Sequence, residues 1–281
     1  MFLESSKRVN GTTPSSVDAG EGGTPELPWY RAVGPERELF EHCSKNNLPM
    51  MLKGPTGCGK SRFVEHMAAK LGRELITVPC HDDTSAADLL GRWLVRGGDT
   101  VWQDGPVTRA VRRGAILYLD EIAEARPDVI VALHPLTDHR RQLYVDRHDE
   151  VLTAPEGFML GVSFNPNYQS GLKELKPSTR QRFVGLSFDY PAPEVEAEVL
   201  IGETGIDAKV AKRLVKLANK LRALDDLGLA ERASTRLLVD AARLMGSGLN
   251  PRLACEAAIA EPLSDDLEVL RALKEIIGLA F

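Results

Sequence analysis

The stretch Gly54-Pro55-Thr56-Gly57-Cys58-Gly59-Lys60-Ser61 decides the fold, because it fits the phosphate-loop pattern G-x-x-x-x-G-K-[ST] at every fixed position. An apolar, strand-like segment at 49–53 precedes it, and a helical segment at 61–71 follows it. Glycines in such a loop let backbone N–H groups curl around an anion, and the helix start adds the positive end of its dipole. The stretch therefore predicts a phosphate site in which Lys60 reaches the β- and γ-phosphates and the Ser61 hydroxyl ligates Mg²⁺.

The composition is that of an ordinary globular protein, with 281 residues of which 43% are hydrophobic. This length suits one large domain or two modest ones. The net charge is −5, from 35 basic and 40 acidic residues, whereas a broad nucleic-acid interface gives a basic face or a high pI. No signal peptide is recognisable, and no segment approaches the ~20 apolar residues of a membrane span. We therefore expect a cytoplasmic protein with no nucleic-acid partner and no membrane segment.

The cysteines are scattered along the chain, at Cys43, Cys58, Cys80 and Cys255. They form no C-x-x-C pair, which argues against a disulfide framework or a zinc site and fits a reducing cytosol. Cys58 lies inside the phosphate loop. We interpret it as a small residue tolerated at a variable position, and a catalytic thiol is the alternative.

Composition and periodicity divide the chain into three parts. Residues 1–28 are predicted to form a disordered tail, because fourteen of the 28 are Gly, Ser, Thr or Pro and no apolar period is present. From Trp29 onward strands and helices alternate, which predicts an α/β nucleotide-binding domain at 29–192 with a parallel sheet flanked by helices. Only helical patterns follow, so 193–281 is predicted to be a small all-α lid domain.

The individual elements follow from apolar runs, caps and prolines. The expected strands are 49–53, 75–79, 115–119, 158–163 and 184–188. The expected helices of the first domain are 35–46, 61–71, 86–90, 106–113 and 127–133. Those of the second are 207–224, a helix capped by Ser234 and stopped by Gly246, a helix opened by Asn250-Pro251, and 267–277.

A second motif lies about sixty residues after the phosphate loop, where the apolar strand 115–119 ends in Asp120-Glu121. Asp120, at the carboxyl end of the strand, is placed to hold Mg²⁺ through water. Glu121 is placed to polarise the attacking water as a general base. ATPases that hydrolyse with a bound water use such a second carboxylate, whereas a small-molecule kinase has less need of one.

Three further polar positions fit the same site. Asn165, at the end of the next strand, could hydrogen-bond the γ-phosphate or the water, although Asn-Pro also marks turns. Arg180 and Arg182 precede the last strand, where an arginine could act on a neighbouring subunit's phosphate, or could belong to a solvated basic turn. Arg236 follows a helix cap and could reach over the nucleotide, or belong to an ordinary capped helix.

Two segments carry weaker signals. A β-hairpin is predicted around the Gly-Gly-Asp turn at 97–99, either as a partner-contacting or pore-facing surface or as a packing flap. The segment 134–141 contains two histidines, but its proline and its arginine pair do not suit a metal-binding helix. We interpret it as a loop or short insert before the strand that leads to Asn165.

Together these residues resemble an AAA+ ATPase of the MoxR type, over the chain from Trp29 to the C-terminus. Several strings resemble the CbbQ/NirQ/NorQ group within that branch, and in detail most closely CbbQ, the ATPase of a bacterial Rubisco activase. These strings are Gly54–Lys60, Trp102–Pro106, His134–Arg140, Tyr168–Ser170 and Ser178–Phe183. The resemblance implies a homohexameric ring that works with a von Willebrand A-domain partner (CbbO-like). It further implies that ATP is used to remodel Rubisco and release inhibitory sugar phosphates.

The resemblance also implies a role for each matching residue, with ATP and Mg²⁺ as cofactors. Lys60 and Ser61 take the Walker A roles, with Ser61 and Asp120 at the magnesium ion. Asp120 and Glu121 take the Walker B roles. Asn165 becomes sensor 1 and Arg236 sensor 2, while Arg182 best fits the arginine finger and Arg180 is the second choice. The other expected nucleotide contacts are Gly54, Pro55, Thr56, Gly57, Cys58, Gly59, Arg62, Val33 and Gly34.

Other functions compete with this interpretation. The same machine could act on a nitric oxide or nitrite reductase instead of Rubisco, since the ATPase core is shared. A nucleic-acid motor or transcriptional activator is disfavoured by the acidic balance and by the lack of a helix-turn-helix. A GTP switch is disfavoured because the base-reading pattern N-K-x-D is missing, Asn219-Lys220-Leu221 being followed by Arg222.

Overall fold

The computed structural model describes residues 27–166, 175–224, 229 and 231–281. The Tyr168–Ser170 string and the predicted tail up to residue 26 lie outside the described residues. Where the description begins, the Pro28 carbonyl oxygen lies 2.9 Å from His66 Nδ1. The chain thus contacts the phosphate-loop helix just before Trp29, where the sequence predicts order to begin.

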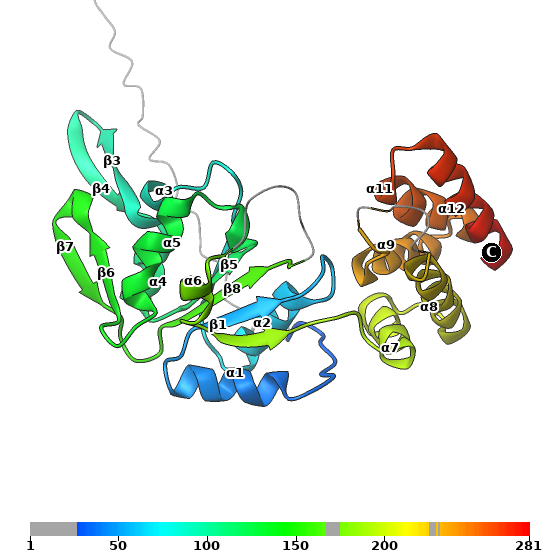
Figure 1. Ribbon diagram of the computed structural model, residues 1–281, viewed down its shortest axis with the longest axis horizontal. Helices are drawn as coiled ribbons and strands as arrows, with labels where there is room; N and C mark the ends of the chain where they lie inside the picture. The colour runs from blue at the N-terminus through cyan, green and yellow to red at the C-terminus, as the bar shows by residue number, and fades with distance from the viewer. Residues whose placement is uncertain (1–26, 167–174, 225–228, 230) are drawn as a thin grey trace, which may run out of the picture.

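A five-stranded parallel sheet in the order β2-β5-β8-β1-β9 forms the centre of the N-terminal part (Figure 1). The strands are β1 (Met50–Lys53), β2 (Leu75–Pro79), β5 (Ile116–Asp120), β8 (Met159–Phe164) and β9 (Val184–Ser187). All five predicted strands are confirmed, with each end within one residue. Because β1 pairs with β8 on one side and β9 on the other, the phosphate loop leaves from the interior of the sheet.

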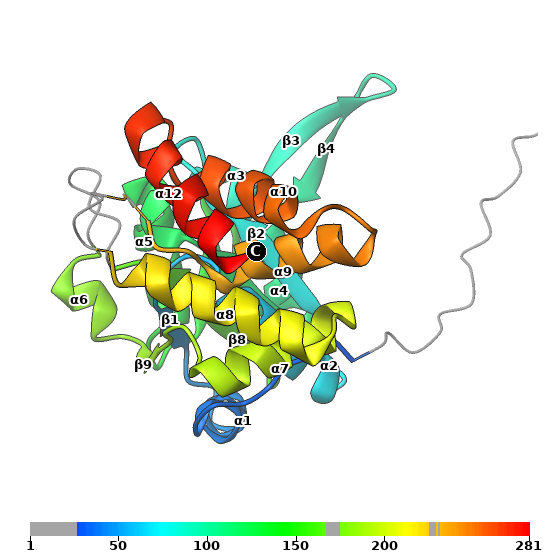
Figure 2. The ribbon, with the colours of Figure 1, turned by 90° about the vertical axis from the view of Figure 1, so that its right-hand side faces the viewer.

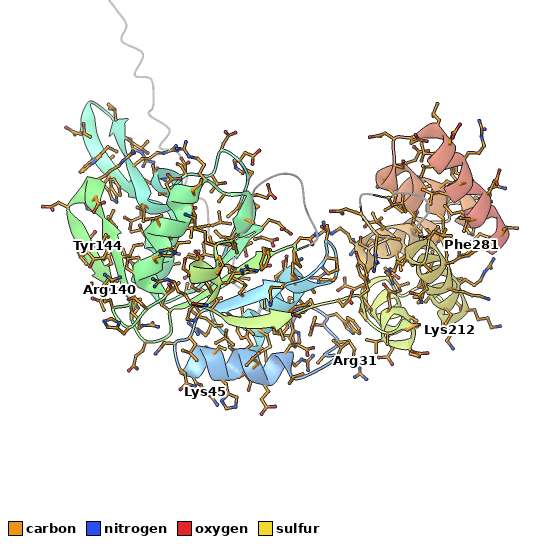
Figure 3. All side chains as sticks on the ribbon, viewed as in Figure 1. Arg31, Lys45, Arg140, Tyr144, Lys212 and Phe281 are labelled. Atoms are coloured by element: carbon orange, nitrogen blue, oxygen red, sulfur yellow. The ribbon has the colours of Figure 1, made fainter. Side chains whose placement is uncertain are left out.

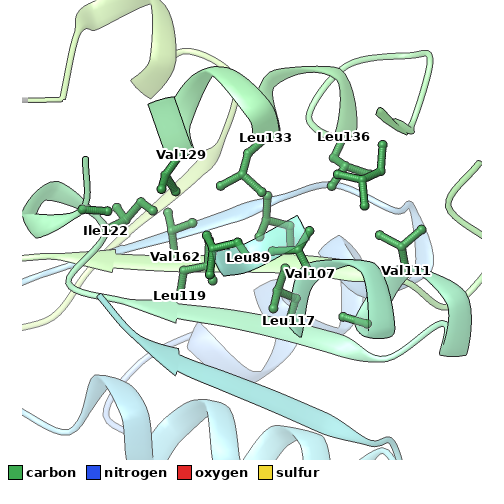
Figure 4. Close-up of a cluster of buried hydrophobic side chains, with 14 of the residues drawn as sticks. Leu89, Val107, Val111, Leu117, Leu119, Ile122, Val129, Leu133, Leu136 and Val162 are labelled. Atoms are coloured by element: carbon green, nitrogen blue, oxygen red, sulfur yellow. The ribbon is translucent and has the colours of Figure 1, made fainter. Parts of the chain in front are cut away.

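Helices cover both faces of this sheet because side chains alternate along each strand. On one face Met50 and Leu52 join a cluster with residues of α1 (Glu36–Lys45) and α2 (Lys60–Lys70). On the other face Met51 joins a second cluster, which Figure 4 shows around Leu117 and Leu119. The helices of that second face are α3 (Ala86–Leu90), α4 (Pro106–Arg113) and α5 (Pro127–Leu133). Every helix predicted for this part is confirmed.

The predicted hairpin is present as β3 (Gly91–Arg96) and β4 (Asp99–Asp104), paired antiparallel. Its two-residue turn consists of Gly97 and Gly98, with φ of 62° and 95°. Positive φ at both turn positions matches the right-handed twist of the strands, and glycine adopts it without steric cost.

A second hairpin was not predicted from the sequence. It consists of β6 (Gln142–Val145) and β7 (Glu150–Thr153), and it follows the 3-10 turn η2 (His134–Leu136) within the segment interpreted as a loop or insert. Its connection has no glycine pair, and the left-handed position is taken by Asp149, with φ of 51°. The missing turn signal explains why the pattern was overlooked.

Aromatic rings join the two hairpins at their outer ends. The Trp102 ring stacks on the His148 ring with centroids 4.8 Å apart and planes at 4°, and Trp93 packs edge-on against Trp102 at 5.4 Å. Figure 3 shows Tyr144 of β6 at the opposite end of the molecule from Phe281. The hairpins therefore form one unit, remote from the C-terminal helices.

The part of the chain from Pro193 onward is here called the helical region. Its described residues form helices and loops and no strands (Figure 2). Its longer helices are α7 (Pro193–Thr204), α8 (Ala208–Arg222), α9 (Thr235–Gly246) and α12 (Leu267–Ala280). Shorter turns between α9 and α12 are α10 (Pro251–Cys255), the π-turn η5 (Glu256–Ala260) and α11 (Glu261–Leu263). Its apolar side chains form a core of their own. None of the described helices is long and apolar enough to span a bilayer.

Side-chain caps set the starts of these helices, as the sequence predicts. Ser234 accepts from a backbone N–H of α9, Asn250 from two in α10 and Asp266 from two in α12. Three predicted helix ends in this region were wrong. The helix predicted to reach residue 224 is α8, which ends at Arg222 with Ala223 as its C-cap. Gly246 lies within α9 rather than stopping it, with Ser247 as the C-cap, and the last helix continues to Ala280 because its apolar face still packs on the core.

A buried ion pair holds the helical region together. Glu196 of α7 is fully buried and accepts from both terminal nitrogens of Arg222, at 2.8 and 2.6 Å. The Thr235 hydroxyl donates to the same carboxylate at 2.6 Å. Every charge in this cluster is satisfied, so loss of one partner would leave the other charged and buried.

Arg222→Ala should therefore destabilise the protein by about 3–5 kcal/mol, because the Glu196 carboxylate loses its counter-charge in the core. Urea unfolding followed by far-UV circular dichroism measures this loss. The control is Arg252→Ala, which removes the exposed pair with Glu256 and should cost no more than about 1 kcal/mol. Equal losses in the two variants would contradict the role assigned to the buried pair.

Candidate active site

A cavity of about 1040 Å³ lies between the phosphate loop and the helical region, and is called here the loop cavity. It is lined by Thr56–Ser61, Arg62, Val33, Gly34, Asp120, Glu121, Asn165 and Arg236, among others. The sheet explains this convergence, since the carboxyl ends of parallel strands meet at one edge. The sequence-predicted residues of the loop, the acidic pair and both sensors are therefore brought together.

Lys60 is the buried cation of the site, with 5% of its side chain exposed. Its Nζ donates to the carbonyl oxygens of Gly54 and Pro55, at 2.8 and 2.9 Å, and lies 4.0 Å from Glu121 Oε1. The two carbonyl groups of the loop therefore hold the Lys60 ammonium near the N-terminus of α2. Gly59, with φ of 98°, makes the turn into that helix possible.

The Asp120 carboxylate is held by three hydroxyl groups. Ser61 donates to Oδ2 at 2.9 Å, Tyr118 donates to Oδ1 at 3.0 Å, and Ser163 also donates to Oδ1. The Ser61 hydroxyl and the Asp120 carboxylate thus offer neighbouring hard oxygen atoms. Mg²⁺ prefers such donors, and it is usually held by one or two carboxylates together with substrate phosphates. No group of three or more His, Cys, Asp or Glu suited to a metal occurs among the described residues.

Glu121 occupies a constrained backbone position next to this carboxylate. Its φ is 53°, in the left-handed region, and its N–H donates to Ser163 Oγ at 2.9 Å. Burial raises the pKa of its carboxyl group, while the nearby Lys60 ammonium opposes the shift. A carboxylate with a raised pKa beside a phosphate-binding loop is suited to accept a proton from water.

The remaining predicted contacts lie around the loop. The Asn165 amide donates to Thr56 Oγ1 at 3.4 Å, so the residue predicted as sensor 1 faces the loop from the end of β8. Arg236, in the first turn of α9, lines the cavity from the helical region. Val33 and Gly34 line it on a third side. Arg62 reaches it too, but its guanidinium is paired with Glu203 of α7 at 2.9 Å.

The two candidate finger arginines are not brought to this cavity. Arg180 is exposed at the end of the short helix α6 (Pro177–Arg180). Arg182 is half-buried, with its guanidinium 3.6 Å from the Asp138 carboxylate. Neither arginine lines the loop cavity of its own chain.

Comparison with known proteins places these features in one family. An AAA domain (dynein-related subfamily) matches residues 49–183, and the CbbQ/NirQ/NorQ C-terminal domain matches 196–280. Denitrification regulatory protein NirQ of Pseudomonas aeruginosa is 58% identical over 90% of this chain and 97% of its own length. Protein NorQ of Paracoccus denitrificans is 56% identical over 92% and 96%, and Protein CbbQ of Hydrogenophilus thermoluteolus 56% over 88% and 92%. The chain belongs to the CbbQ/NirQ/NorQ family of AAA+ ATPases.

Family membership confirms the fold class and the resemblance inferred from the motifs, and this AAA+ protein is an ATPase. The relatives named NirQ, NorQ and CbbQ have nearly equal identities, from 56% to 58%. Family membership therefore identifies the type of ATPase but does not identify the client protein on which this ATPase acts.

Several functional positions of this AAA+ protein were missed from the sequence. Tyr118 and Ser163 hold Asp120, while Glu231 accepts from Thr56 Oγ1 at 3.0 Å and Tyr190 donates to the Thr56 carbonyl at 3.1 Å. Ser163 had a usable signal, because it precedes Asn165 by two residues and so projects from the same face of β8. The other contacts join distant parts of the chain and have no local signature.

Cys58 does not have the environment of a catalytic thiol. It is buried, and this burial raises the pKa of its thiol against the opposing effect of Lys60. Because the nucleophilic form of cysteine is the thiolate, a raised pKa disfavours reactivity. The structure thus supports the interpretation of Cys58 as a small residue in the loop.

Proposed function

We propose that this AAA+ ATPase is a remodelling chaperone that hydrolyses ATP with Mg²⁺ in the loop cavity and drives a conformational change in a client enzyme. One observation supports it most: Lys60, Asp120, Glu121 and Asn165 converge at the phosphate loop, with Arg236 across the cavity. In this proposal residues 29–192 form the nucleotide-binding domain and 193–281 form the lid.

The phosphate loop and Lys60 bind the substrate in this mechanism. The ammonium, now held by two loop carbonyls, lies where it can donate to β- and γ-phosphate oxygens. Bound Mg²⁺, held by Ser61 and through water by Asp120, would neutralise charge on the same oxygens. Arg236 approaches from the helical region, so that binding of the triphosphate can draw this region toward the loop.

Glu121 activates the attacking water in the next step. Its carboxylate takes a proton from the water as the oxygen attacks the γ-phosphorus, and the bond to the β,γ-bridging oxygen breaks. Burial makes the carboxylate more basic, and Lys60 favours its ionised form. The Asn165 amide, on the strand next to β5, is placed to donate to the γ-phosphate or to orient the water.

Glu121→Gln should bind ATP like the wild type and hydrolyse it at least about 100-fold more slowly, because only the proton acceptor is lost. Fluorescent-nucleotide titration and phosphate release measure binding and turnover. The matched control is Lys60→Ala, which should lose binding itself. Turnover by Glu121→Gln at the wild-type rate would exclude Glu121 as the base.

The position of the two candidate fingers supports a ring, which we propose to be a homohexamer. Arg182 would act on the γ-phosphate bound by the adjacent subunit, with Arg180 as the alternative. An arginine supplied in trans stabilises the charge of the transferring phosphoryl group. Each active site then needs two chains, and activity depends on assembly.

This trans arrangement predicts that two inactive variants restore activity when mixed. In a ring assembled at random from equal amounts of Arg182→Ala and Glu121→Gln chains, about a quarter of the interfaces combine an intact Glu121 with an intact Arg182. We expect about a quarter of wild-type ATPase activity after co-refolding. The same mixture made with Arg180→Ala identifies the finger. Absence of recovery with both arginine variants would contradict the trans role.

We propose that the client is Rubisco. The ATPase would act in the cytoplasm together with a von Willebrand A-domain partner, and it would release inhibitory sugar phosphates from Rubisco. The five motif strings that resemble the CbbQ branch support it, as does the relative named CbbQ. The second candidate is activation or maturation of a nitric oxide or nitrite reductase. The relatives named NirQ and NorQ, whose lengths the chain covers almost entirely, favour that alternative.

Capture with the ATP-locked Glu121→Gln variant separates the two clients. Tagged protein is isolated from its native lysate, and bound proteins are identified by mass spectrometry, with Lys60→Ala as the control that cannot hold ATP. Rubisco subunits together with a von Willebrand A-domain protein are the expected result. A nitrogen-oxide reductase in their place would keep the mechanism and overturn the Rubisco assignment.

A further inference from the structure

Ser163 lies at a position that neither the phosphate-loop motif nor the acidic motif includes. It is fully buried near the end of β8, and β8 pairs with β5 up to the Leu119–Val162 pair. It therefore sits beside the point where β5 ends in the two acidic residues. Asn165 directly follows β8, two residues after Ser163.

The Ser163 hydroxyl uses both of its hydrogen-bonding capacities on the acidic pair. It donates its proton to Asp120 Oδ1, and its oxygen accepts the backbone N–H of Glu121 at 2.9 Å. No other described residue makes both contacts. One buried hydroxyl group thus connects the proposed magnesium ligand with the backbone of the proposed base.

The backbone of Glu121 makes this second contact important. Its φ of 53° is unusual for a residue with a side chain, and such conformations persist only where the surroundings hold them. Directly after it the chain turns into the 3-10 helix η1 (Ile122–Glu124). The bond from Glu121 N–H to Ser163 Oγ fixes the peptide from which the carboxylate of the base projects.

We propose that Ser163 is a positioning residue for ATP hydrolysis, which sets the orientation of the Glu121 base relative to Asp120. This inference rests on the proposed function, in which Glu121 is the base. Ser163 does not touch the reacting atoms and acts through its two neighbours. Its removal should lower the rate of the chemical step more than it weakens nucleotide binding.

Tyr118 gives a matched comparison, because its hydroxyl donates to the same Asp120 Oδ1 at 3.0 Å and has no hydrogen bond to Glu121. Tyr118→Phe therefore removes the bond to Asp120 and a 3.4 Å contact with Ser61 Oγ, and it leaves the Glu121 N–H bonded to Ser163. Ser163→Ala instead removes support for both Asp120 and Glu121. Thr108→Val controls for loss of any buried hydroxyl. Thr108 is fully buried on α4, donates to the Leu90 carbonyl and lies outside the loop cavity.

The experiment measures kcat, the KM for ATP, the affinity for fluorescent ADP and the affinity for Mn²⁺ in the ADP complex by electron paramagnetic resonance. For Ser163→Ala we expect kcat to fall about 10- to 100-fold, the loss typical of a misplaced catalytic group, while ADP affinity stays within about threefold. Tyr118→Phe should weaken Mn²⁺ binding with a smaller loss of kcat. Ser163→Thr, which keeps the hydroxyl, should recover most of the rate, and Thr108→Val should keep wild-type kinetics.

Two results would overturn the positioning role. One is a kcat for Ser163→Ala within twofold of the wild type. The other is a loss of activity that only parallels a loss of thermal stability and is shared by Thr108→Val. Failure of this inference can be distinguished from failure of the proposed function, since Glu121→Gln tests the base directly. Inactive Glu121→Gln with fully active Ser163→Ala would refute the inference about Ser163 and leave the function intact.

Discussion

The rest of the site depends on a single buried charge, the ammonium of Lys60. A buried cation is costly unless oxygen atoms surround it, and here two carbonyls of the phosphate loop and the carboxylate of Glu121 supply them. The loop must therefore close around the lysine, and the acidic strand must end beside it. In the proposed mechanism triphosphate oxygens replace these partners, so the Lys60 charge stays paired when nucleotide binds.

A second constraint comes from the close approach of the helical region to the loop. A Cβ atom on Gly57 would lie 2.7 Å from the Ser234 side chain, so only glycine allows the start of α9 to pack there. The same approach places Arg236 in the cavity. Thr56 adds polar contacts, because its hydroxyl donates to Glu231 and its carbonyl accepts from Tyr190. The loop thus contacts the helical region directly through Glu231, and it contacts Tyr190 just before that region.

The sequence predicted the elements of this fold well where local rules determine them. The strands, the helices of the first part and the caps at Ser234, Asn250 and Asp266 follow from alternation and capping chemistry. It missed the β6–β7 hairpin, whose turn uses Asp149 in place of glycine, and it placed the stop of α9 at Gly246, one residue before the Ser247 C-cap. The loop lysine and acidic pair were accessible as motifs, but their supporting contacts come from residues far apart in the chain.

Catalytic geometry here is determined by backbone pairing between three neighbouring strands. Lys60 follows β1, Asp120 ends β5 with Glu121 directly after it, and β8 lies between these two strands, carries Ser163 and leads directly into Asn165. Because each strand is fixed to the next by a ladder of hydrogen bonds, the sheet sets the relative backbone positions of these residues. The side-chain rotamers then decide where the functional groups lie. Side-chain bonds then refine what the sheet allows. The Ser163 hydroxyl on the middle strand bonds both the Asp120 carboxylate and the backbone N–H of Glu121, so it joins the two acidic residues directly.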